Sequence, residues 1–522
     1  MTLDIAAFGA AAEGGNVARL YDTTAEERGD APALESHGEV VTHADFRAAS
    51  AAFAGGLHDR GVEVGDALLL YLPNCPQYLV ASVGCFRAGV AVSPVNPQYR
   101  ARELAHQLTD TDASVVVTHA ALREHLAGAL AEVDADPVVV TVGDEVPEGD
   151  VPFDEVRGEP TTVEVEGDHV ASLPYTSGTT GTPKGVRLTH DNLRAQLLTS
   201  IATRSDDLGP DGVNSLVWLP LYHITGFVHT ALQPLVRGGT LYIRSAANWD
   251  AEAAMRLVDE ESISEFVGVT AMYADMVAHD SFGDYDLTSL VQASEGGAKL
   301  TASVQERFED TANVAVFEGY GLTETTGATH TQLGSTFGPS HGTVGQPFRH
   351  TDCRIVDGSG EEVGLGETGE LLVRGPQVMA GYHGLPEATE EAFTEHGFFR
   401  TGDIARRDER GYFEIVDRKK HVIVTAGYNV YPSEVEDLLA EHEAVREAAV
   451  VGVPDERRNE TVKAYVVPAN GDADDPGVTA EAIKEFSLDR IAAYKHPREV
   501  EFIDELPRTA SGKIQKYKLE GE

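Results

Sequence analysis

The chain has 522 residues and a formal net charge of −45, from 40 Lys and Arg against 85 Asp and Glu. Surface area scales with mass, so this charge is roughly one net negative charge per 400 Å². Nucleic-acid backbones and anionic lipid surfaces carry the same sign and are excluded as primary partners. Only ten basic residues are lysine, and the acids are spread along the whole chain. This composition indicates a protein of an extreme halophile, with a salt-rich cytoplasm.

At roughly 100–200 residues per domain, the length predicts two to four domains or subdomains. The three cysteines, Cys75, Cys85 and Cys353, form no CxxC pair, so no disulfide framework is expected. The first residues lack the basic-then-apolar order of a signal peptide, and no apolar run approaches the ~20 residues of a membrane helix. We therefore expect a cytoplasmic protein with no transmembrane segment.

Strand-like and helix-like segments alternate along most of the chain, which is typical of an α/β fold. The first examples are strands at 66–73, 90–96 and 113–119, with helices at 75–89 and 101–110 between them.

Three later regions differ in character. Residues 144–169 are polar and acidic, which predicts a surface connection. Residues 351–416 contain short β segments with glycine turns, which predicts a smaller β-rich subdomain. After residue 420 we expect a compact α+β region with a helix at 433–442 and strands at 445–454 and 461–468. Eight of the ten lysines lie at or beyond Lys419.

The strongest local motif is LPYTSGTTGTPKGV at 173–186, which joins a predicted strand to a helix that begins near Thr189. Glycines let backbone N–H groups converge, hydroxyls add donors, and Lys184 adds a positive charge, so the loop suits a polyphosphate. It is not a Walker A loop, because Pro183 and Gly185 stand where that pattern needs Gly and Ser or Thr. A flexible linker is the alternative, but a linker hardly accounts for a lysine in a chain so poor in lysine.

A second glycine motif, GLGETG at 364–369, matches GxGxxG but leads into a strand instead of a helix. We therefore interpret it as a turn between strands and not as a dinucleotide site. In FEGYGLTETTG at 317–327, Tyr320 offers an aromatic face to a purine, Thr323 a hydroxyl, and Glu324 a hard oxygen ligand for Mg²⁺. A tight turn before a helix is the alternative there.

Two motifs near the C-terminus complete the set. Asp403, in the TGD of RTGDIARRDERGYFEIVDRKK (400–420), has two carboxylate oxygens for the two hydroxyls of a ribose, or is an ordinary cap. Lys513 lies in the glycine-containing LPRTASGKI (506–514), where a solvated lysine is the ordinary alternative.

These elements, together with GELLVRGPQVMAGY at 369–382, occur in one order and resemble the adenylate-forming ligase superfamily over about residues 17–519. The chain is most similar to fatty-acid and 4-coumarate-type acyl-CoA synthetases. The resemblance implies an α/β fold with a large N-terminal domain (1–417), a hinge (418–420) and a small mobile α+β C-terminal domain (421–522). It implies activation of a carboxylate by ATP and Mg²⁺ to an acyl-adenylate, then transfer to CoA.

The resemblance also implies roles for individual residues. The loop 176–184 holds the β- and γ-phosphates, Tyr320 stacks on adenine, Asp403 binds the ribose, and Arg418 bonds near it. The residues implied to contact nucleotide or CoA are Thr176, Ser177, Gly178, Thr179, Thr180, Gly181, Lys184, Gly297, Glu318, Gly319, Tyr320, Gly321, Asp403, Arg418 and Gly427.

The catalytic assignments follow in the same way. Thr323 touches the α-phosphate, Glu324 ligates Mg²⁺, and Lys513 bridges the carboxylate and the α-phosphate. His223, in WLPLYHITGF (218–227), lies beside the carboxylate, although a packed core histidine is a plain alternative. Lys420 matches the hinge position, and Gly427 lies beside the pantetheine channel.

The acyl pocket is expected to involve 218–227, 268–276 and 294–300, with Gly226, Gly296 and Gly297 leaving an open apolar tunnel. Thr270 and Lys299 depart from the family pattern, which has proline at both positions. No aspartate in 218–227 is available to an α-ammonium group, which argues against an amino acid, and the length argues against acetate.

We therefore expect a medium- or long-chain fatty acid as substrate. An aryl-CoA ligase, a ligase that loads a carrier protein and a non-catalytic nucleotide sensor are the alternatives, and a homodimer remains open.

Overall fold

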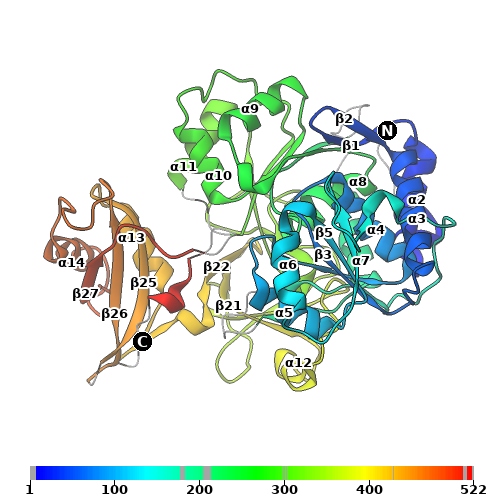
Figure 1. The fold of residues 1–522 in the computed structure, drawn as a ribbon. Helices are drawn as coiled ribbons and strands as arrows, with labels where there is room; N and C mark the ends of the chain where they lie inside the picture. Colours follow the sequence, from blue (N-terminus) through cyan, green and yellow to red (C-terminus); the bar gives the residue numbers. More distant parts are fainter. Residues whose placement is uncertain are drawn as a thin grey trace. The chain divides into compact units, whose positions relative to one another are not determined.

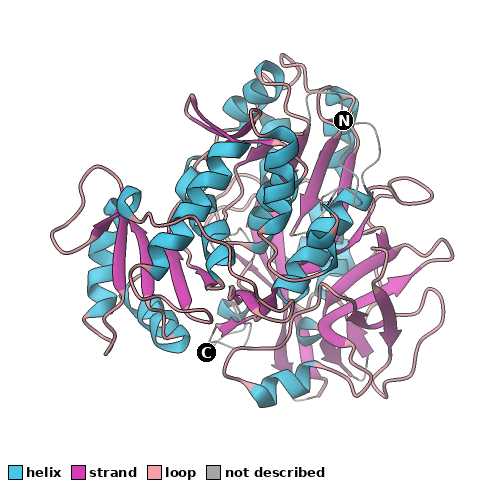
Figure 2. Cartoon of the chain, turned by 90° about the vertical axis from the view of Figure 1, so that its right-hand side faces the viewer, coloured by secondary structure: helices cyan, strands magenta, loops and turns pink. Residues whose placement is uncertain are grey.

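The computed structural model describes residues 8–176, 183–203, 213–297, 300, 302–426, 428–455, 457–508 and 514–519. The chain divides into two compact units. The first comprises Met1–Asp352 and Val373–Phe399, and the second comprises Cys353–Leu372 and Arg400–Glu522. Strands and helices alternate as predicted, and sheets are flanked by helices (Figure 2).

The first unit contains a nine-stranded sheet whose central strands run parallel. At one edge β16 turns back antiparallel into β17, and this turn carries the YGLTE motif. In spatial order the strands are β18 (Gln346–Pro347), β17 (Gly327–Thr331), β16 (Val316–Leu322), β15 (Gln292–Gly296), β14 (Glu265–Gly268), β12 (Asn214–Val217), β13 (Thr240–Ile243), β1 (Pro32–Ser36) and β2 (Glu39–Thr42).

A seven-stranded sheet is the second layer of this unit, and the early predicted strands form its centre. A separate hairpin is formed by β9 (Tyr175–Thr176) and β10 (Lys184–Gly185), the two strands at the ends of the predicted phosphate loop 176–184, called the Gly/Thr loop below. In spatial order the strands are β11 (Leu188–Thr189), β8 (Val170–Ser172), β4 (Ala91–Pro94), β3 (Ala67–Tyr71), β5 (Val115–His119), β6 (Val138–Val142) and β7 (Val151–Pro152).

Helices cover these sheets, and α9, α10 and α11 form one group beside the nine-stranded sheet (Figure 1). The helices of the first unit are α1 (Ala10–Glu13), α2 (Arg19–Arg28), α3 (His43–His58), α4 (Pro76–Ala88), α5 (Ala101–Thr111), α6 (Arg123–Leu130), α7 (His190–Thr203), the π-helix η4 (Thr225–Leu232), α8 (Gln233–Val236), α9 (Ala251–Glu260), α10 (Thr270–Ala278), α11 (Ala302–Ala312) and α12 (Pro386–Ala392).

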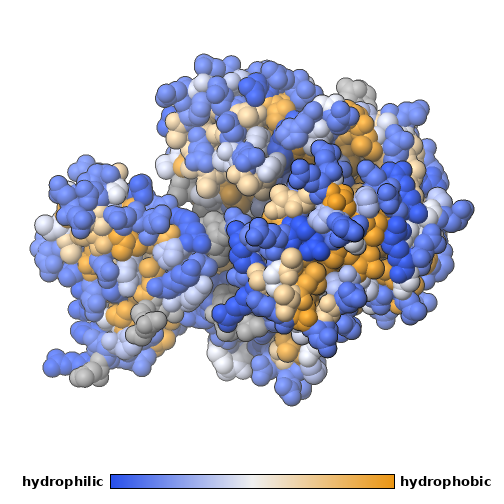
Figure 3. Space-filling model, in the orientation of Figure 1, coloured by the Kyte–Doolittle hydropathy of each residue, from blue (hydrophilic) through white to orange (hydrophobic). Residues whose placement is uncertain are grey.

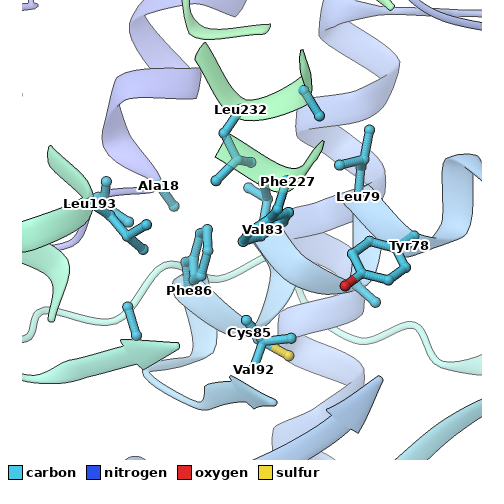
Figure 4. Packing of buried hydrophobic residues seen from close by; sticks show 14 of the residues in the cluster. Ala18, Tyr78, Leu79, Val83, Cys85, Phe86, Val92, Leu193, Phe227 and Leu232 are labelled. Atoms are coloured by element: carbon cyan, nitrogen blue, oxygen red, sulfur yellow. The ribbon is translucent and has the colours of Figure 1, made fainter. Parts of the chain in front are cut away.

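Helix α4 shows why the local sequence folds as predicted. Pro76 stands at its first turn, where no N–H partner is needed, and Gly89 ends it in the left-handed region at φ 68°. The helix is buried almost all round because its side chains meet those of η4 and α7 in one core (Figure 4). Helix α7 begins as predicted, since Thr189 and Asn192 cap each other's backbone N–H groups.

The connection at 144–169 is more deeply buried than predicted. Val156 is 1% exposed, and the backbone of Gly158 donates to the carbonyl of Ala52 in α3. A Cβ at Gly55 would lie 2.1 Å from the carbonyl oxygen of Glu159, so only glycine lets the connection pass this close to the helix. The polar composition concealed this backbone packing.

The second unit contains the predicted β-rich subdomain and the α+β region. The β-rich sheet has the spatial order β19 (Asp352–Val356), β20 (Gly369–Arg374), β21 (Phe399–Arg407) and β22 (Phe413–Arg418). GLGETG is the turn between β19 and β20, as interpreted from the sequence. The predicted boundary at 417/418 stays a prediction.

The α+β region is a five-stranded sheet with helices on one face. Side chains of α13 and α14 pack with those of β25 and β26 in one core, and a smaller cluster covers the other face. The elements are β23 (Ile423–Thr425), β24 (Tyr428–Val430), α13 (Pro432–Ala440), β25 (Val445–Asp455), β26 (Asn459–Pro468), α14 (Ala480–Leu488) and β27 (Glu499–Phe502).

Two further expectations concern the surface and the thiols. Among the helices of the described chain, none is long and apolar enough to span a bilayer. Cys75, Cys85 and Cys353 are free, as their spacing predicts. Hydrophilic residues dominate the visible face in Figure 3, in keeping with the charge of the chain.

Three histidines in the first unit are buried as neutral rings. Burial lowers the pKa of His43 to about 4 and the pKa of His190 and of His330 to about 3. The Nδ1 of His190 accepts from the backbone N–H of Val17 at 3.0 Å, which places a lone pair there and not a proton. Folding therefore requires the neutral rings.

We predict that stability falls steeply with acid. Unfolded histidines titrate at ~6.5, so below that pH the unfolded state binds more protons, and each ring costs about 2 kcal/mol by about pH 5. The loss of stability begins below about pH 6.5 and levels off near the pKa values that the histidines have in the folded state. His190→Asn keeps an acceptor for Val17 but does not titrate. Urea unfolding in molar KCl should show about 2 kcal/mol less loss for this variant between about pH 7 and pH 5; an equal loss contradicts the assignment.

Candidate active site

The Gly/Thr loop is anchored at both ends by the β9–β10 hairpin, in which Thr176 pairs with Lys184 and Tyr175 with Gly185. A Cβ at Gly185 would lie 3.0 Å from the Tyr175 ring, so glycine allows the strands to close. The phenolic oxygen of Tyr175 hydrogen bonds to the Asp110 carboxylate of α5. The hairpin thus holds Thr176 and Lys184 at the two ends of the predicted phosphate loop.

The YGLTE motif forms the turn from β16 through the 3₁₀ turn η6 (Thr323–Thr325) to β17. The strand register shifts between Tyr320 and Gly321. A Cβ at Gly321 would lie 2.0 Å from the carbonyl oxygen of Gly327, so the close return of the chain requires glycine. The turn is further fixed by His229, whose Nε2 accepts from the N–H of Ala328 at 3.0 Å.

The segment that ends at Tyr382 joins this turn to the phosphate loop. The phenol of Tyr382 donates to Oε1 of Glu324 at 3.1 Å, and Nζ of Lys184 lies 5.0 Å from the centre of the Tyr382 ring. Burial and the Glu324 carboxylate raise the pKa of Tyr382, so its hydroxyl remains a donor. Tyr382 therefore contacts both Lys184 and Glu324, and Lys184 pairs with Thr176. The roles of Thr176, Lys184 and Glu324 at a nucleotide stay predictions.

The remaining predicted nucleotide residues of the first unit lie along β15 and β16. Gly319 and Tyr320 are half-buried, and the Tyr320 ring centre lies 5.8 Å from that of His330. Glu318 is buried, and its strand position pairs with Glu295 of β15. Gly297 follows β15 with φ 133°, a conformation that favours glycine.

The segment with His223 is held by a residue that sequence reasoning missed. Asn74 donates from Nδ2 to the carbonyl of Leu219 and accepts from the N–H of Leu221. The imidazole of His223 is half-buried, and its Nδ1 accepts from the N–H of Thr225 at 3.3 Å. The proposed contact of His223 with a carboxylate stays a prediction.

The prediction that Gly226 leaves open space in the acyl tunnel is wrong. A Cβ at Gly226 would lie 2.2 Å from the carbonyl oxygen of Pro220, so this glycine serves a close backbone approach and leaves no open space. By contrast, a Cβ at Gly296 would meet Cγ2 of Thr225 at 3.5 Å, and a Cβ at Gly297 would meet Cγ1 of Val269 at 3.8 Å. No backbone passes as close to these two glycines as to Gly226 in the described structure, and their place in an acyl tunnel stays a prediction.

The second unit holds Asp403 and Arg418 opposite each other on β21 and β22. Nε of Arg418 lies 2.8 Å from Oδ1 of Asp403, and the Asp403 side chain is 3% exposed. One carboxylate oxygen of Asp403 thus accepts from Arg418. Lys420, the predicted hinge residue, lies exposed in the 3₁₀ turn η7 (Lys419–His421).

Seven predicted site residues lie outside the described residues: Ser177, Gly178, Thr179, Thr180, Gly181, Gly427 and Lys513. Tyr382, Asn74 and His229 were not singled out from the sequence. Tyr382 ends a motif that was recognised, but the motif carried no sign that its last residue contacts Glu324.

Lys184, Tyr382 and Glu324 lie together in the first unit, and Asp403 pairs with Arg418 in the second unit. Comparison with known proteins then identifies the family. Residues 21–383 match the AMP-binding enzyme family and residues 434–513 match the AMP-binding enzyme C-terminal domain, so the chain belongs to this family. It is an AMP-forming acid–thiol ligase, and such ligases use ATP, Mg²⁺ and CoA.

Relatives cover nearly the whole chain. A feruloyl-CoA synthase of Amycolatopsis is 38% identical over 486 residues, 93% of this chain and 94% of that protein. A long-chain-fatty-acid–CoA ligase of Salmonella typhimurium is 34% identical over 538 residues, 97% and 94% of the two chains. ATP-bound MatB of Rhodopseudomonas palustris has a TM-score of 0.87 at 29% identity, covering 96% of this chain and 98% of its own.

Proposed function

We propose that the enzyme activates a medium- or long-chain fatty acid with ATP to an acyl-adenylate and then transfers the acyl group to CoA. The observation that carries the nucleotide half of the proposal is the contact of Tyr382 with both Lys184 and Glu324, beside the phosphate loop. The similarity to long-chain fatty-acid ligases supports the acid.

The site residues fit Mg²⁺. Glu324 offers hard carboxylate oxygens, the type of ligand that Mg²⁺ prefers, and one of them accepts from Tyr382. The described residues contain no group of three or more His, Cys, Asp or Glu side chains that could hold a metal by themselves. This suits Mg²⁺, which one carboxylate and the phosphates hold together. When bound, the ion neutralises phosphate charge.

The chain's own residues then have distinct tasks. Lys184 orients the terminal phosphates, and Asp403 with Arg418 fixes the ribose. Lys513 supplies positive charge where the carboxylate meets the α-phosphate, because attack of one anion on another needs a cation between them. Holding both reactants in place accounts for much of the remaining rate gain.

An aryl acid is the second candidate. The feruloyl-CoA synthase at 38% identity favours it, as does a benzoate CoA ligase of Burkholderia xenovorans with a TM-score of 0.84 and 25% identity. The deciding experiment is a CoA-thioester assay in molar KCl over saturated acids of graded length, benzoate and cinnamates. Higher kcat/KM for the long saturated acids supports the proposal, and higher values for cinnamates establish the alternative.

The same assay separates the remaining alternatives. A carrier protein in place of CoA tests the loading reaction, and absence of acid-dependent pyrophosphate release would indicate a nucleotide sensor. The expected cytoplasmic location and the homodimer stay predictions; light scattering in molar KCl tests the homodimer.

We predict that enlarging Gly296 shortens the range of acids accepted. Among the described residues, its Cβ position meets only the Thr225 methyl at ordinary contact distance, whereas a side chain at Gly297 is strained by its positive φ. Gly296→Leu should therefore lower kcat/KM for long acids at least about tenfold more than for short ones. Gly296→Ala, the matched small change, should show a weaker trend in the same order. An equal loss of kcat/KM for acids of all chain lengths would contradict the prediction that the acyl chain packs against Gly296.

A further inference from the structure

The segment 376–383, which follows β20 and carries Tyr382, is hydrogen bonded on both sides. Towards the phosphate loop, Arg187 donates its N–H to the carbonyl of Gly381 at 2.9 Å, and His383 donates to the carbonyl of Gly185 at 2.8 Å. Towards the Glu324 turn, the N–H of Met379 donates to the carbonyl of Glu324 at 2.8 Å. The segment therefore fixes the spacing between the loop and the turn.

Tyr382 lies at the centre of this bridge. Its backbone pairs with Val186, and its N–H donates to Oγ1 of Thr389 at 2.9 Å, so the side chain is set from two directions. Nζ of Lys184 lies 5.0 Å from the centre of the ring, and the hydroxyl donates a hydrogen bond to Oε1 of Glu324 at 3.1 Å. One side chain thus contacts both the cation and the anion of the site.

We propose that Tyr382 is a positioning residue that keeps Lys184 and Glu324 apart, so that the lysine remains available to phosphate and the carboxylate to Mg²⁺. This inference rests on the proposed function. In a partly buried site, opposite charges attract more strongly than in water. Without a spacer they can close into an ion pair, which both the phosphates and the metal must then break.

The two contacts of Tyr382 predict separate effects. Tyr382→Phe keeps the ring for Lys184 and removes only the donor to Glu324. Loss of a group that orients a metal ligand commonly costs 10- to 100-fold in metal affinity or activity, so half-saturating Mg²⁺ should rise about tenfold. ATP binding measured without metal should not change. Mn²⁺, followed by electron paramagnetic resonance in the enzyme–ATP mixture, gives a readout independent of turnover.

Tyr382→Leu removes both contacts and should weaken ATP binding by a further roughly fivefold. The decisive comparison adds Lys184→Met. In the Tyr382→Leu background it removes the cation that pairs with Glu324, so half-saturating Mn²⁺ should fall by about threefold or more. In the wild-type background the same change measures the effect on Mn²⁺ that follows from weaker phosphate binding alone, and the two effects should differ by about threefold or more. Equal effects in both backgrounds would show no coupling and overturn the spacing role.

Tyr285→Phe is the matched control, because Tyr285 also donates to a glutamate, Oε1 of Glu252, at 3.1 Å but lies outside the site. A Mg²⁺ shift for Tyr382→Phe no larger than for this control overturns the inference. Glu324→Gln separates the inference from the function on which it rests. If it leaves Mg²⁺ dependence unchanged, the proposed metal role of Glu324 fails; if it changes that dependence while Tyr382→Phe does not, only the inference fails.

Discussion

Dialysis from molar KCl into dilute buffer is expected to unfold the protein and abolish its activity. At ~1 M salt the Debye length is about 3 Å, but at ~0.01 M it is about 30 Å, so charges on neighbouring elements then repel. A net charge of −45 on 522 residues leaves few basic partners for the acids. A folded domain is stable by only ~5–15 kcal/mol, so we expect this unscreened repulsion to unfold it.

Helix α12 (Pro386–Ala392) illustrates the local cost. It carries Glu387, Glu390 and Glu391 and no basic residue, so like charges lie one turn apart. The triple change of these residues to Gln should move the unfolding midpoint to lower salt. Circular dichroism is followed across a KCl series and across a sulfate series at equal ionic strength. Equal midpoints indicate charge screening, and a lower midpoint in sulfate indicates stronger apolar burial. Unchanged dichroism and full activity after dialysis to low salt would refute the prediction.

The parts of the fold that sequence predicts well are those fixed by local rules. Helix α4 follows from Pro76, Gly89 and an apolar run, and the start of α7 follows from a capping pattern at Thr189. The YGLTE turn is recognisable because Gly321 meets the strict steric need of a close backbone return. Each signal lies within about a dozen residues of the structure that it predicts.

The parts that sequence did not predict depend on contacts between distant segments. Tyr382 and Glu324 are 58 positions apart, and nothing in either motif encodes their hydrogen bond. Gly226 was expected to open space, but glycine also serves where another backbone passes closely, and only the position of Pro220 distinguishes the two cases. Burial of the acidic connection at Val156 likewise depends on glycines in α3, a hundred residues earlier.

The catalytic cycle is expected to fail in two separable ways, because the family uses one small domain for both half-reactions. Lys513 is implied to serve adenylation, and Gly427 to lie beside the pantetheine channel for thioester formation. If the two residues act in turn on one adenylate, we expect the small domain to rotate about Lys420 between the two steps. Each half-reaction should therefore be lost without the other.

Lys513→Ala should abolish acid-dependent pyrophosphate release, by roughly 100-fold or more, because no cation then offsets repulsion between the carboxylate and the α-phosphate. Thioester formation from supplied acyl-adenylate and CoA should remain within roughly threefold of wild type. The residues on either side have contacts of their own. The backbones of Arg508 and Ile514 form an antiparallel β-bridge, and Nζ of Lys516 lies 2.7 Å from Oε1 of Glu436. These contacts involve no atom of the Lys513 side chain, so the variant should fold normally.

Gly427→Leu should do the reverse, forming adenylate normally while its side chain blocks the thiol. Lys420→Pro should also spare adenylation and lose transfer, because proline fixes the hinge φ angle. Both half-reactions are measured separately on all three variants, as pyrophosphate release and as thioester formed from supplied adenylate. If Lys513→Ala lost both steps equally while remaining folded, or Gly427→Leu lost neither, alternation of one domain between two faces would be the wrong mechanism for this enzyme.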